Sequence, residues 1–399
     1  MRMKKKVTQR PMPKKKRISK TTTNRISATK IDGSGAASSI PTPTSGEYSL
    51  YYHVPFCKKK CDYCHFYVIP DKESDKDLLL EGFRREFQLR KPSGKLVSLY
   101  FGGGTPSLFG PERVQEVISW SPPCSEITLE ANPDGIDLKL LKAYRNAGIN
   151  RLSFGVQSFD NTDLVQLGRT HSASQAEKAL LLTCEAGFDS VSLDLMYDLP
   201  FQDLSHWEKS LKRAASLPIQ HLSLYNLTLE PATLFFKKKE SLMRAMPSPE
   251  LSLRLYQRAQ EILTDAGFYQ YEISAFAKPG FYSRHNTGYW LGRPFLGLGP
   301  SAFSYWNHKR FRNVAHLRKY LAALSQNEFP VDFEEELSPQ ARERELFALH
   351  LRLLQGAPLP SFQDELVPLV EQGLLSFGPP VKLTSKGILL YDTIASEII

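Results

Sequence analysis

From residue 48 onward, short hydrophobic runs alternate with longer stretches whose apolar positions recur at helical spacing. Runs rich in β-branched and aromatic residues predict strands, and apolar positions three or four residues apart predict helices. The predicted strands are 48–54, 96–102, 126–132, 151–157, 190–197 and 221–229. The predicted helices are 74–90, 111–119, 137–147, 174–186, 204–216 and 249–266.

This alternation of strand and helix predicts an α/β fold with a parallel sheet and helices outside it. Gly148 and Gly187 directly follow two of the predicted helices, where a left-handed end residue favours glycine. Six strand–helix units predict a partial TIM-like (β/α)6 barrel over residues 48–330, together with its extension. In such barrels the functional residues lie at the carboxyl ends of the strands.

After about residue 330 the alternation stops. Residues 338–353 read as a helix capped by Ser338, and residues 361–375 as a second helix interrupted by Pro368. A short strand at 381–384 and a last helix follow. We therefore predict a small, mainly helical, winged-helix-like domain over residues 331–399. No run approaches the ~18 apolar residues that a membrane span needs.

The first 47 residues have a different composition. Residues 1–30 hold twelve Lys or Arg and no acid, and Ser, Thr, Gly and Pro dominate up to residue 47. Removing those twelve from the 51 basic residues leaves 39 against 42 acids, so the rest of the chain is slightly acidic. We predict a disordered tail whose removal up to residue 46 leaves folding unchanged. It is either a solvated extension or a segment that contacts RNA or anionic lipid.

Three of the five cysteines, Cys57, Cys61 and Cys64, fall within eight residues directly after the first predicted strand. This clustering predicts a metal or cluster site in a reducing compartment, and we expect the cytoplasm. Three thiolates satisfy three irons of a [4Fe-4S] cubane, and the open fourth iron can bind S-adenosylmethionine. Cleavage of that ligand needs an electron donor. The alternatives are unrelated thiols or a structural zinc site with His53 or His65 as fourth ligand.

Polar or glycine-rich positions follow the later strands. YFGGGTPS (100–107) ends the second strand, and Glu130, Gln157 and Asp194 lie at or near the ends of three others. We expect these side chains to face one mouth of the barrel. A carboxylate such as Glu130 can hold ribose hydroxyls, and Arg169 can pair with a ligand carboxylate. Taken singly, each of these residues also suits a turn or a helix cap.

The pattern YxHxPFCxxxCxxCxF resembles the radical-SAM proteins related to oxygen-independent coproporphyrinogen III oxidase, and the likeness runs from about residue 48 to the C-terminus. It implies that Gly103, Gly104 and Thr105 contact S-adenosylmethionine near its amino group. The residues that also match cofactor-contacting positions of the family are Tyr51, Tyr63, Glu130, Gln157, Arg169 and Asp194.

Two functions share this core. The oxidase is an enzyme that removes carbon dioxide from porphyrinogen propionates, whereas the HemW branch consists of heme chaperones. Phe66 stands where oxidases carry a fourth cysteine, the N-terminal residues do not resemble a substrate cover, and HNTGYW (285–290) matches the HNxxYW motif of HemW. The resemblance therefore favours a chaperone without oxidase activity. It implies a protein that binds heme and transfers it to acceptors such as respiratory enzymes.

His285 offers an imidazole, a common axial ligand of heme iron, and Asn286 and Tyr289 can orient it or meet a propionate. The alternative is a local hydrogen-bonding turn at His285 and Asn286, with Trp290 in the core. A third class of function, an RNA-modifying radical-SAM enzyme, is disfavoured by the acidic balance of residues 31–399. We recognise no nucleic-acid-binding module in the sequence and expect no nucleic-acid partner for the folded core.

Overall fold

The computed structural model describes residues 40–399, so most of the predicted tail lies outside the described residues. Residues 40–47, by contrast, are placed on the folded body. Ile40 packs against the cluster formed by Tyr271, Ala275 and Ala277, and its backbone N–H donates to Gln355 Oε1 at 3.2 Å. The partners of Ile40 lie more than 200 residues away along the chain. Composition, which is a local property, therefore assigned these residues to the tail.

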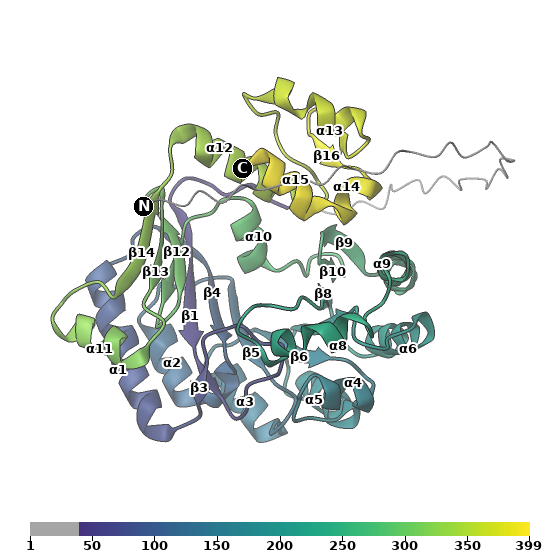
Figure 1. Ribbon diagram of the computed structural model, residues 1–399. Helices are drawn as coiled ribbons and strands as arrows, with labels where there is room; N and C mark the ends of the chain where they lie inside the picture. The colour runs from purple at the N-terminus through teal and green to yellow at the C-terminus, as the bar shows by residue number, and fades with distance from the viewer. Residues whose placement is uncertain (1–39) are drawn as a thin grey trace, which may run out of the picture. The chain divides into compact units, whose positions relative to one another are not determined.

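Six parallel strands form the centre of the sheet, as the sequence predicts (Figure 1). They lie side by side in chain order, and the hydrogen-bonded pairs between them are all parallel. The strands are β1 (Glu47–Val54), β4 (Lys95–Gly103), β5 (Glu126–Ala131), β6 (Arg151–Gln157), β7 (Ser190–Tyr197) and β8 (His221–Asn226). Their carboxyl ends therefore lie at one edge, where the predicted site residues are expected.

Helices pack on the outer face of these strands and share one hydrophobic core with them. Each of the six helices predicted between residues 74 and 266 begins and ends within one residue of its predicted limits. They are α1 (Glu73–Arg90), α2 (Pro111–Ser119), α3 (Leu138–Asn146), α5 (Ala173–Glu185), α6 (Leu204–Ala215) and α9 (Pro249–Asp265). The side chains of Asp137, Ser172 and Asp203 accept hydrogen bonds from the first turns of α3, α5 and α6, which fixes where these helices begin.

The sheet extends beyond the six predicted strands at both edges, to twelve strands in all. Strand β11 (Phe295–Leu298) joins β1 in parallel, and three antiparallel strands follow it: β12 (Phe303–Trp306), β13 (Lys309–Asn313) and β14 (Val331–Glu336). At the other edge β10 (Ala275–Ala277) and β9 (Tyr269–Glu272) follow β8. Strand β14 carries the sheet beyond residue 330, the boundary that the sequence predicts.

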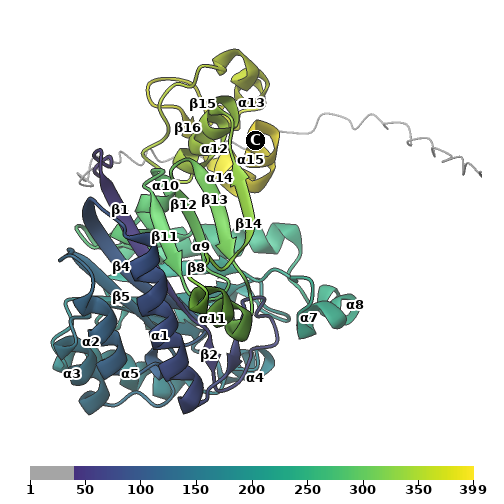
Figure 2. The same cartoon turned by 90° about the vertical axis from the view of Figure 1, so that its left-hand side faces the viewer.

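The last residues form a small helical unit with its own hydrophobic cluster, which includes Phe347, Leu366, Val381 and Ile394. Figures 1 and 2 show these elements gathered around α12. They are α12 (Pro339–Leu351), η2 (Gln363–Leu366), α13 (Val367–Glu371), β15 (Leu375–Ser376), β16 (Lys382–Leu383), α14 (Ser385–Leu389) and α15 (Tyr391–Ile398). As predicted, the Ser338 side chain caps α12, accepting from the N–H of Ala341. The helix predicted over residues 361–375 is shorter: α13 ends at Glu371, Pro368 lies in its first turn, where proline is tolerated, and Gly373 follows with a φ of 69°.

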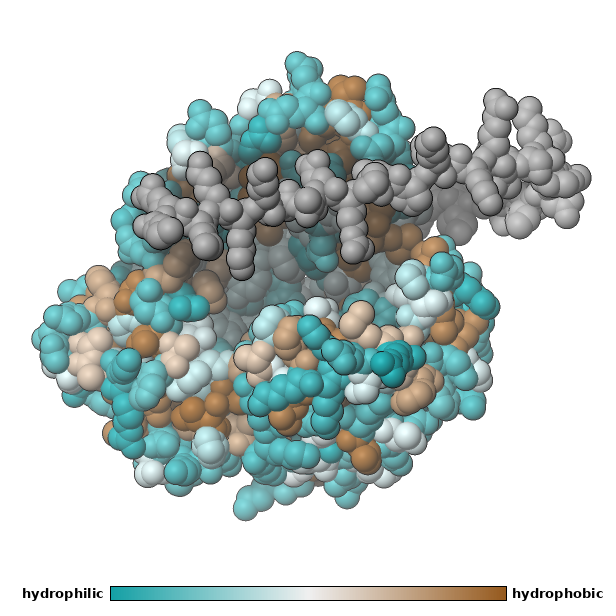
Figure 3. Space-filling model, viewed as in Figure 1, coloured by the Kyte–Doolittle hydropathy of each residue, from teal (hydrophilic) through white to brown (hydrophobic). Residues whose placement is uncertain are grey.

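Shorter helices complete the described part of the chain. They are η1 (Pro106–Leu108), α4 (Asn161–Gln166), α7 (Leu234–Lys237), α8 (Lys239–Met243), α10 (Arg284–Trp290) and α11 (Leu317–Ser325). Among residues 40–399, no helix has the length and apolar character needed to cross a membrane. Figure 3 shows apolar residues in small areas between hydrophilic ones on one face, which is hollowed near its centre.

Candidate functional site

The cysteine loop follows β1 and is fastened at both ends. Strands β2 (Phe56–Cys57) and β3 (Ile69–Pro70) pair in parallel and so close the loop. The N–H of Ile69 donates to the Pro55 carbonyl at 2.8 Å. Inside the loop, the N–H of Cys64 donates to the Cys61 carbonyl at 3.2 Å. The three thiols are thus held on one short, closed segment at the end of the first strand.

A cavity of about 440 Å³, here called the cysteine cavity, lies between this loop and the ends of the strands. All three clustered cysteines line it, together with eight of the nine predicted cofactor residues. Those eight are Tyr63, Gly103, Gly104, Thr105, Glu130, Gln157, Arg169 and Asp194. The tertiary structure therefore brings together residues from four strand ends and two loops, as expected from the parallel order of the strands.

Tyr51 is the predicted cofactor residue that does not line the cysteine cavity. Its hydroxyl is 3.1 Å from His53 Nδ1, and its ring stacks on Tyr100 with centroids 6.2 Å apart. Tyr51 and His53 instead line a second cavity, described below. Residues two apart on a strand share a face, so both rings turn to the same side of β1.

The glycine-rich turn after β4 passes directly against the cysteine loop. The N–H of Gly104 donates to the Val54 carbonyl at 2.9 Å, and that of Thr105 to the Phe56 carbonyl at 2.8 Å. A Cβ at Gly104 would lie 2.7 Å from both the Pro55 carbonyl carbon and the Phe56 oxygen. Because these are backbone atoms, only glycine fits here, as the close approach predicted from the sequence requires.

A chain of hydrogen bonds links two of the cysteines around the wall of the cavity. Thr105 Oγ1 lies 3.5 Å from Cys57 Sγ and accepts from Asn132 Nδ2 at 3.1 Å. Arg169 donates to Asn132 Oδ1 at 2.7 Å and to Cys61 Sγ at 3.4 Å. The sequence analysis missed Asn132. The signal that could have found it is its position directly after β5, since other residues of this site are also polar and lie at strand ends.

Two half-buried carboxyl groups, Glu130 and Asp194, share the cavity. Glu130 accepts hydrogen bonds from the Tyr100 hydroxyl at 2.8 Å and the Gly103 N–H at 3.2 Å. Burial raises the pKa of Glu130, and burial together with the neighbouring Glu130 charge raises the pKa of Asp194 to about 7. The pair therefore favours ligand groups that donate hydrogen bonds or carry positive charge.

The end of β6 is irregular where it meets the cavity. Gln157 has a left-handed backbone with a φ of 70°, and the pairing of β6 with β7 shifts between Gly155 and Gln157. A Cβ at Gly155 would lie 3.0 Å from Gln157 Nε2 and 3.4 Å from Arg169 Nη2. A bulge of this kind redirects side chains at the rim of a barrel. Strained non-glycine residues are characteristic of functional sites.

The donor set fits an iron–sulfur cluster. Burial raises the pKa of the Cys57 thiol to about 11 and also raises that of Cys64, so iron must displace protons when it binds. Within the described residues, no three or more His, Cys, Asp or Glu are close enough to hold a single metal ion. The ligands of a cubane do not need to lie as close together, because each thiolate binds a different iron. Arg169 Nε is buried and unpartnered among the described residues, and it provides a further donor at this wall.

His285 belongs to a closed hydrogen-bond network on α10. The Glu126 carboxylate accepts from the N–H groups of Arg284 at 2.9 Å and His285 at 2.8 Å, at the start of the helix. The ring of His285 bonds through Nδ1 to Ser98 Oγ at 2.9 Å and through Nε2 to the Tyr289 hydroxyl at 2.7 Å. Burial lowers its pKa to about 3. Both ring nitrogens are occupied, which matches the structural alternative for this motif.

The other motif residues differ in placement. Tyr289 and Trp290 line the second cavity, so Trp290 is not a core residue, and the Arg352 guanidinium lies 4.2 Å from its ring. The backbone N–H of Asn286 donates to Ser283 Oγ at 3.2 Å. Asn286 is absent from the linings of both cavities. The predicted heme contacts of His285 and Asn286 stay predictions, and only Tyr289 reaches a cavity wall.

Comparison with known proteins identifies relatives of the whole folded chain. A family model described as the radical SAM superfamily matches residues 51–214. The heme chaperone HemW of Bacillus subtilis (strain 168) is 33% identical over 365 residues, which cover 86% of this chain and 96% of that protein. HemW of Synechocystis is 36% identical over 351 residues, 83% of this chain and 84% of that protein.

A cattle protein, Radical S-adenosyl methionine domain-containing protein 1, mitochondrial, is 40% identical over 280 residues. The match covers 68% of this chain and 62% of the cattle protein. Among solved structures, coproporphyrinogen III oxidase (HemN) from Escherichia coli, a radical SAM enzyme, has a TM-score of 0.75 at 25% identity. That match covers 88% of this chain and 89% of the oxidase, so the six-strand barrel and its extension are shared.

Proposed function

This chain belongs to the family of the heme chaperone HemW within the radical SAM superfamily, and from that premise we propose that it binds heme and transfers it to acceptor proteins. A radical-SAM cluster site accompanies this role, as the superfamily implies. The observation that carries the cofactor part is the convergence of Cys57, Cys61 and Cys64 on the cysteine cavity with the strand-end residues.

The side chains of this cavity divide into groups with different tasks. Cys57, Cys61 and Cys64 would hold the cluster, which supplies one-electron reduction of S-adenosylmethionine when both are bound. Gly103 and Gly104 let the turn after β4 lie directly against His53 and the cysteine loop, which places this turn at the cavity wall. Glu130 and Asp194 offer acceptors for amino or hydroxyl groups, and Arg169 keeps Asn132 and Cys61 in place.

Phe66 favours the chaperone over the oxidase. Oxidases related to this family place a fourth cysteine at this position, whereas Phe66 gives an apolar ring that is 53% exposed beside the cavity. An exposed ring provides a surface for a flat apolar ligand and supplies no thiol. The oxidase remains the alternative function, since the solved oxidase shares the fold.

The partners follow from this assignment. We propose heme as cargo, heme-requiring proteins such as respiratory enzymes as acceptors, and a separate electron donor for the cluster. Three thiols near the surface need a reducing compartment, for which the cytoplasm is our proposal. Because a vertebrate relative is named as mitochondrial, fluorescent fusions with and without residues 1–39 would test that assignment directly.

One pair of assays tests the function. Anaerobically reconstituted protein is titrated with ferric heme, and the same preparation is incubated with coproporphyrinogen III, S-adenosylmethionine and a reductant. We expect saturable heme binding and no decarboxylated product. Production of protoporphyrinogen would replace the chaperone assignment with that of an oxidase. Failure of the reconstituted protein to bind heme would remove the chaperone assignment.

A further inference from the structure

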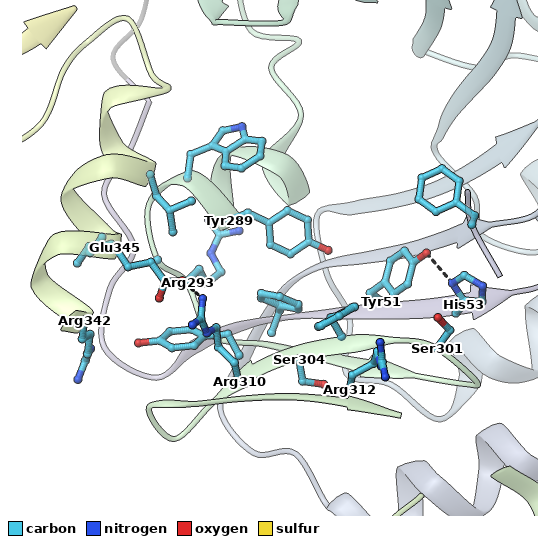
Figure 4. A pocket seen from close by; sticks show the side chains of 18 of the residues that line it. Tyr51, His53, Tyr289, Arg293, Ser301, Ser304, Arg310, Arg312, Arg342 and Glu345 are labelled. Atoms are coloured by element: carbon cyan, nitrogen blue, oxygen red, sulfur yellow. Dashed lines mark hydrogen bonds and ion pairs between the residues drawn. The ribbon is translucent and has the colours of Figure 1, made fainter. Parts of the chain in front are cut away.

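A second cavity, here called the aromatic cavity, lies beside the cysteine cavity and has a volume of about 640 Å³. Its walls come from β1, from α10, from the β12–β13 hairpin and from α12. Figure 4 shows Tyr51 and His53 on one side, Ser304 and Arg312 below, and Tyr289 and Arg293 above them. Of the strands among these elements, the sequence predicts only β1.

Aromatic rings dominate the walls of the aromatic cavity. Eight of its lining residues are Phe, Tyr or Trp, and they include Phe66, Tyr289, Trp290 and Phe303. Phe303 is 51% exposed, and the ring of Phe295 packs edge-on against Tyr289 with centroids 4.5 Å apart. Exposed rings around an open space are unfavourable in water, and a flat apolar ligand would cover them.

The charged side chains of this cavity are mostly cations: Arg293, Arg310, Arg312 and Arg342, against the single acid Glu345. Arg310 and Arg312 are two apart on β13 and so share one face of the strand. The terminal nitrogens of Arg310 are already paired with Glu345 and Glu335, so Arg312 is the one of the two that can face a ligand. Arg312 donates through Nε to Asp332 at 2.9 Å and its guanidinium lies 5.7 Å from the centroid of the Phe303 ring. Its terminal nitrogens have no hydrogen-bond partner among residues 40–399. An excess of arginine beside aromatic walls suits a flat ligand that carries carboxylates.

Three buried donor atoms also lack hydrogen-bond partners in the described part of the chain. They are Nε of Arg293, which is 6% exposed, Nε of Arg310 and Nε1 of Trp290. All three residues line the aromatic cavity. Buried donors without an acceptor are rare in folded proteins and mark a place where a ligand or water completes them.

His65 stands between the two cavities and lines both. It directly follows Cys64, its side chain is exposed, and its ring stacks on Phe66 with centroids 4.7 Å apart. Within residues 40–399 it has no hydrogen bond, whereas both nitrogens of His53 are occupied, by Tyr51 and by the Tyr67 carbonyl. Of the histidines in the aromatic cavity, His65 is therefore the one with free ring nitrogens.

We infer that the aromatic cavity is the heme site, with His65 as a ligand of the heme iron and Arg312 facing a propionate. The inference rests on the proposed function, since it assigns a place to the heme of a heme chaperone. It also links the two cavities, because the residue next to the cluster ligand Cys64 contacts the cargo. In this assignment His285 does not contact the heme. Its hydrogen bond with the Tyr289 hydroxyl positions that residue at the wall of the aromatic cavity.

The iron ligand is tested by spectroscopy on the full, anaerobically reconstituted chain. His65→Ala should shift the Soret band and the spin state of bound ferric heme and weaken binding about tenfold. Added imidazole should restore the wild-type spectrum, which a merely structural role of His65 would not allow. His206→Ala, at an exposed histidine of α6, is the matched control and should leave the spectrum unchanged.

The propionate contacts are tested with two ligands, heme and heme dimethyl ester, whose propionates carry no charge. Wild-type protein should prefer heme by about tenfold, and Arg312→Gln should reduce that preference severalfold through loss of a charge-assisted hydrogen bond. Arg318→Gln, at an exposed arginine of α11, should keep the preference. If wild-type protein bound heme and heme dimethyl ester equally well, the assignment of Arg312 to a propionate would be overturned.

The outcomes separate this inference from the proposed function. If wild-type protein binds no heme, the chaperone assignment fails together with the site. If wild-type protein binds heme and His65→Ala has the same spectrum and affinity, the chaperone assignment stands and the iron ligand lies elsewhere. A wild-type spectrum in His65→Ala together with a changed spectrum in His285→Gln would return the ligand to the HNTGYW motif.

Discussion

At the scale of single residues, the cysteine cavity is built from side chains whose tasks differ although their positions are alike. Most lie at or near the end of a parallel strand, whereas Arg169 follows α4. The chain of hydrogen bonds from Cys57 through Thr105, Asn132 and Arg169 to Cys61 holds the loop in place. A change at any member of this chain should therefore act on the proposed cluster ligands, even when the changed residue is not itself a ligand.

The cysteines give the first prediction. Replacing Cys57, Cys61 or Cys64 by Ala should abolish the cluster, because three thiolates are the minimum that leaves one iron open for S-adenosylmethionine. Iron analysis and visible absorption after anaerobic reconstitution measure this, with about four irons per chain expected for the wild type. Cys124→Ala and Cys184→Ala are the controls, since neither residue lines the cysteine cavity.

Gly104 gives a second prediction. Gly104→Ala places a methyl group 2.7 Å from the Phe56 carbonyl oxygen, so the turn or the cysteine loop must move. We expect a loss of about 1–3 kcal/mol in the free energy of unfolding and weaker S-adenosylmethionine binding. Gly378→Ala has no atom closer than 4.0 Å and should change neither quantity. Urea unfolding and equilibrium dialysis would show whether Gly104→Ala behaves like this control, contrary to the prediction.

His285 predicts a pH effect on stability. Its folded pKa of about 3 lies below the ordinary 6.5, so the folded protein excludes a proton that the unfolded chain accepts. Stability from this residue is present above pH 6.5 and decreases as the pH falls toward 3, by up to about 1.4 kcal/mol per pH unit. Between pH 6 and pH 5, urea unfolding of His285→Gln should lose about 1 kcal/mol less than the wild type loses. His206→Gln should follow the wild type, and an identical loss in His285→Gln would contradict the burial argument.

At the scale of elements, the short helix α10 connects the HNTGYW motif to the aromatic cavity. It begins where Ser283 and Glu126 accept its first N–H groups, and Gly288 allows the Arg293 guanidinium to pack against it. A Cβ at Gly288 would lie 2.5 Å from Arg293 Nη1. The motif thus determines the position of a helix whose last two residues line the cavity.

The cap of this helix yields a prediction. Ser283→Ala removes the acceptor for the Asn286 N–H, so the free energy of unfolding should fall by about 1 kcal/mol. Heme affinity should fall as well, because Tyr289 and Trp290 are positioned by α10. Ser248→Ala removes the equivalent cap of α9 and should have a similar effect on stability with no effect on heme binding. Equal heme affinities in the two variants would show that α10 does not shape the site.

At the scale of the whole molecule, the start of the folded body yields a prediction. Deleting residues 1–39 should leave the free energy of unfolding and the iron content unchanged, as the composition of that segment suggests. Deleting residues 1–46 should decrease stability by about 1 kcal/mol, since it removes Ile40, which packs against the cluster of Tyr271, Ala275 and Ala277. Urea unfolding of the two truncated proteins measures the difference, and identical curves would contradict it.

The sequence by itself determined the six parallel strands, the limits of their helices to within one residue, and the cysteine loop with its glycine turn. Local information is sufficient for these features, because hydrophobic spacing, helix caps and ligand spacing all act within a few residues. Because the carboxyl ends of parallel strands lie at one edge of the sheet, Glu130, Gln157 and Asp194 are then expected around one cavity.

Only the tertiary structure decided which way Tyr51 faces, that Asn132 joins two cysteines, and that both nitrogens of His285 are occupied. It also decided that β11 to β14 extend the sheet and, with α10 and α12, enclose the aromatic cavity. These features depend on pairing between segments far apart in the chain, such as β1 with β11, where short strands carry little periodic signal. The free energy that stabilises these strand pairs comes from contacts between distant segments, which no local sequence pattern encodes.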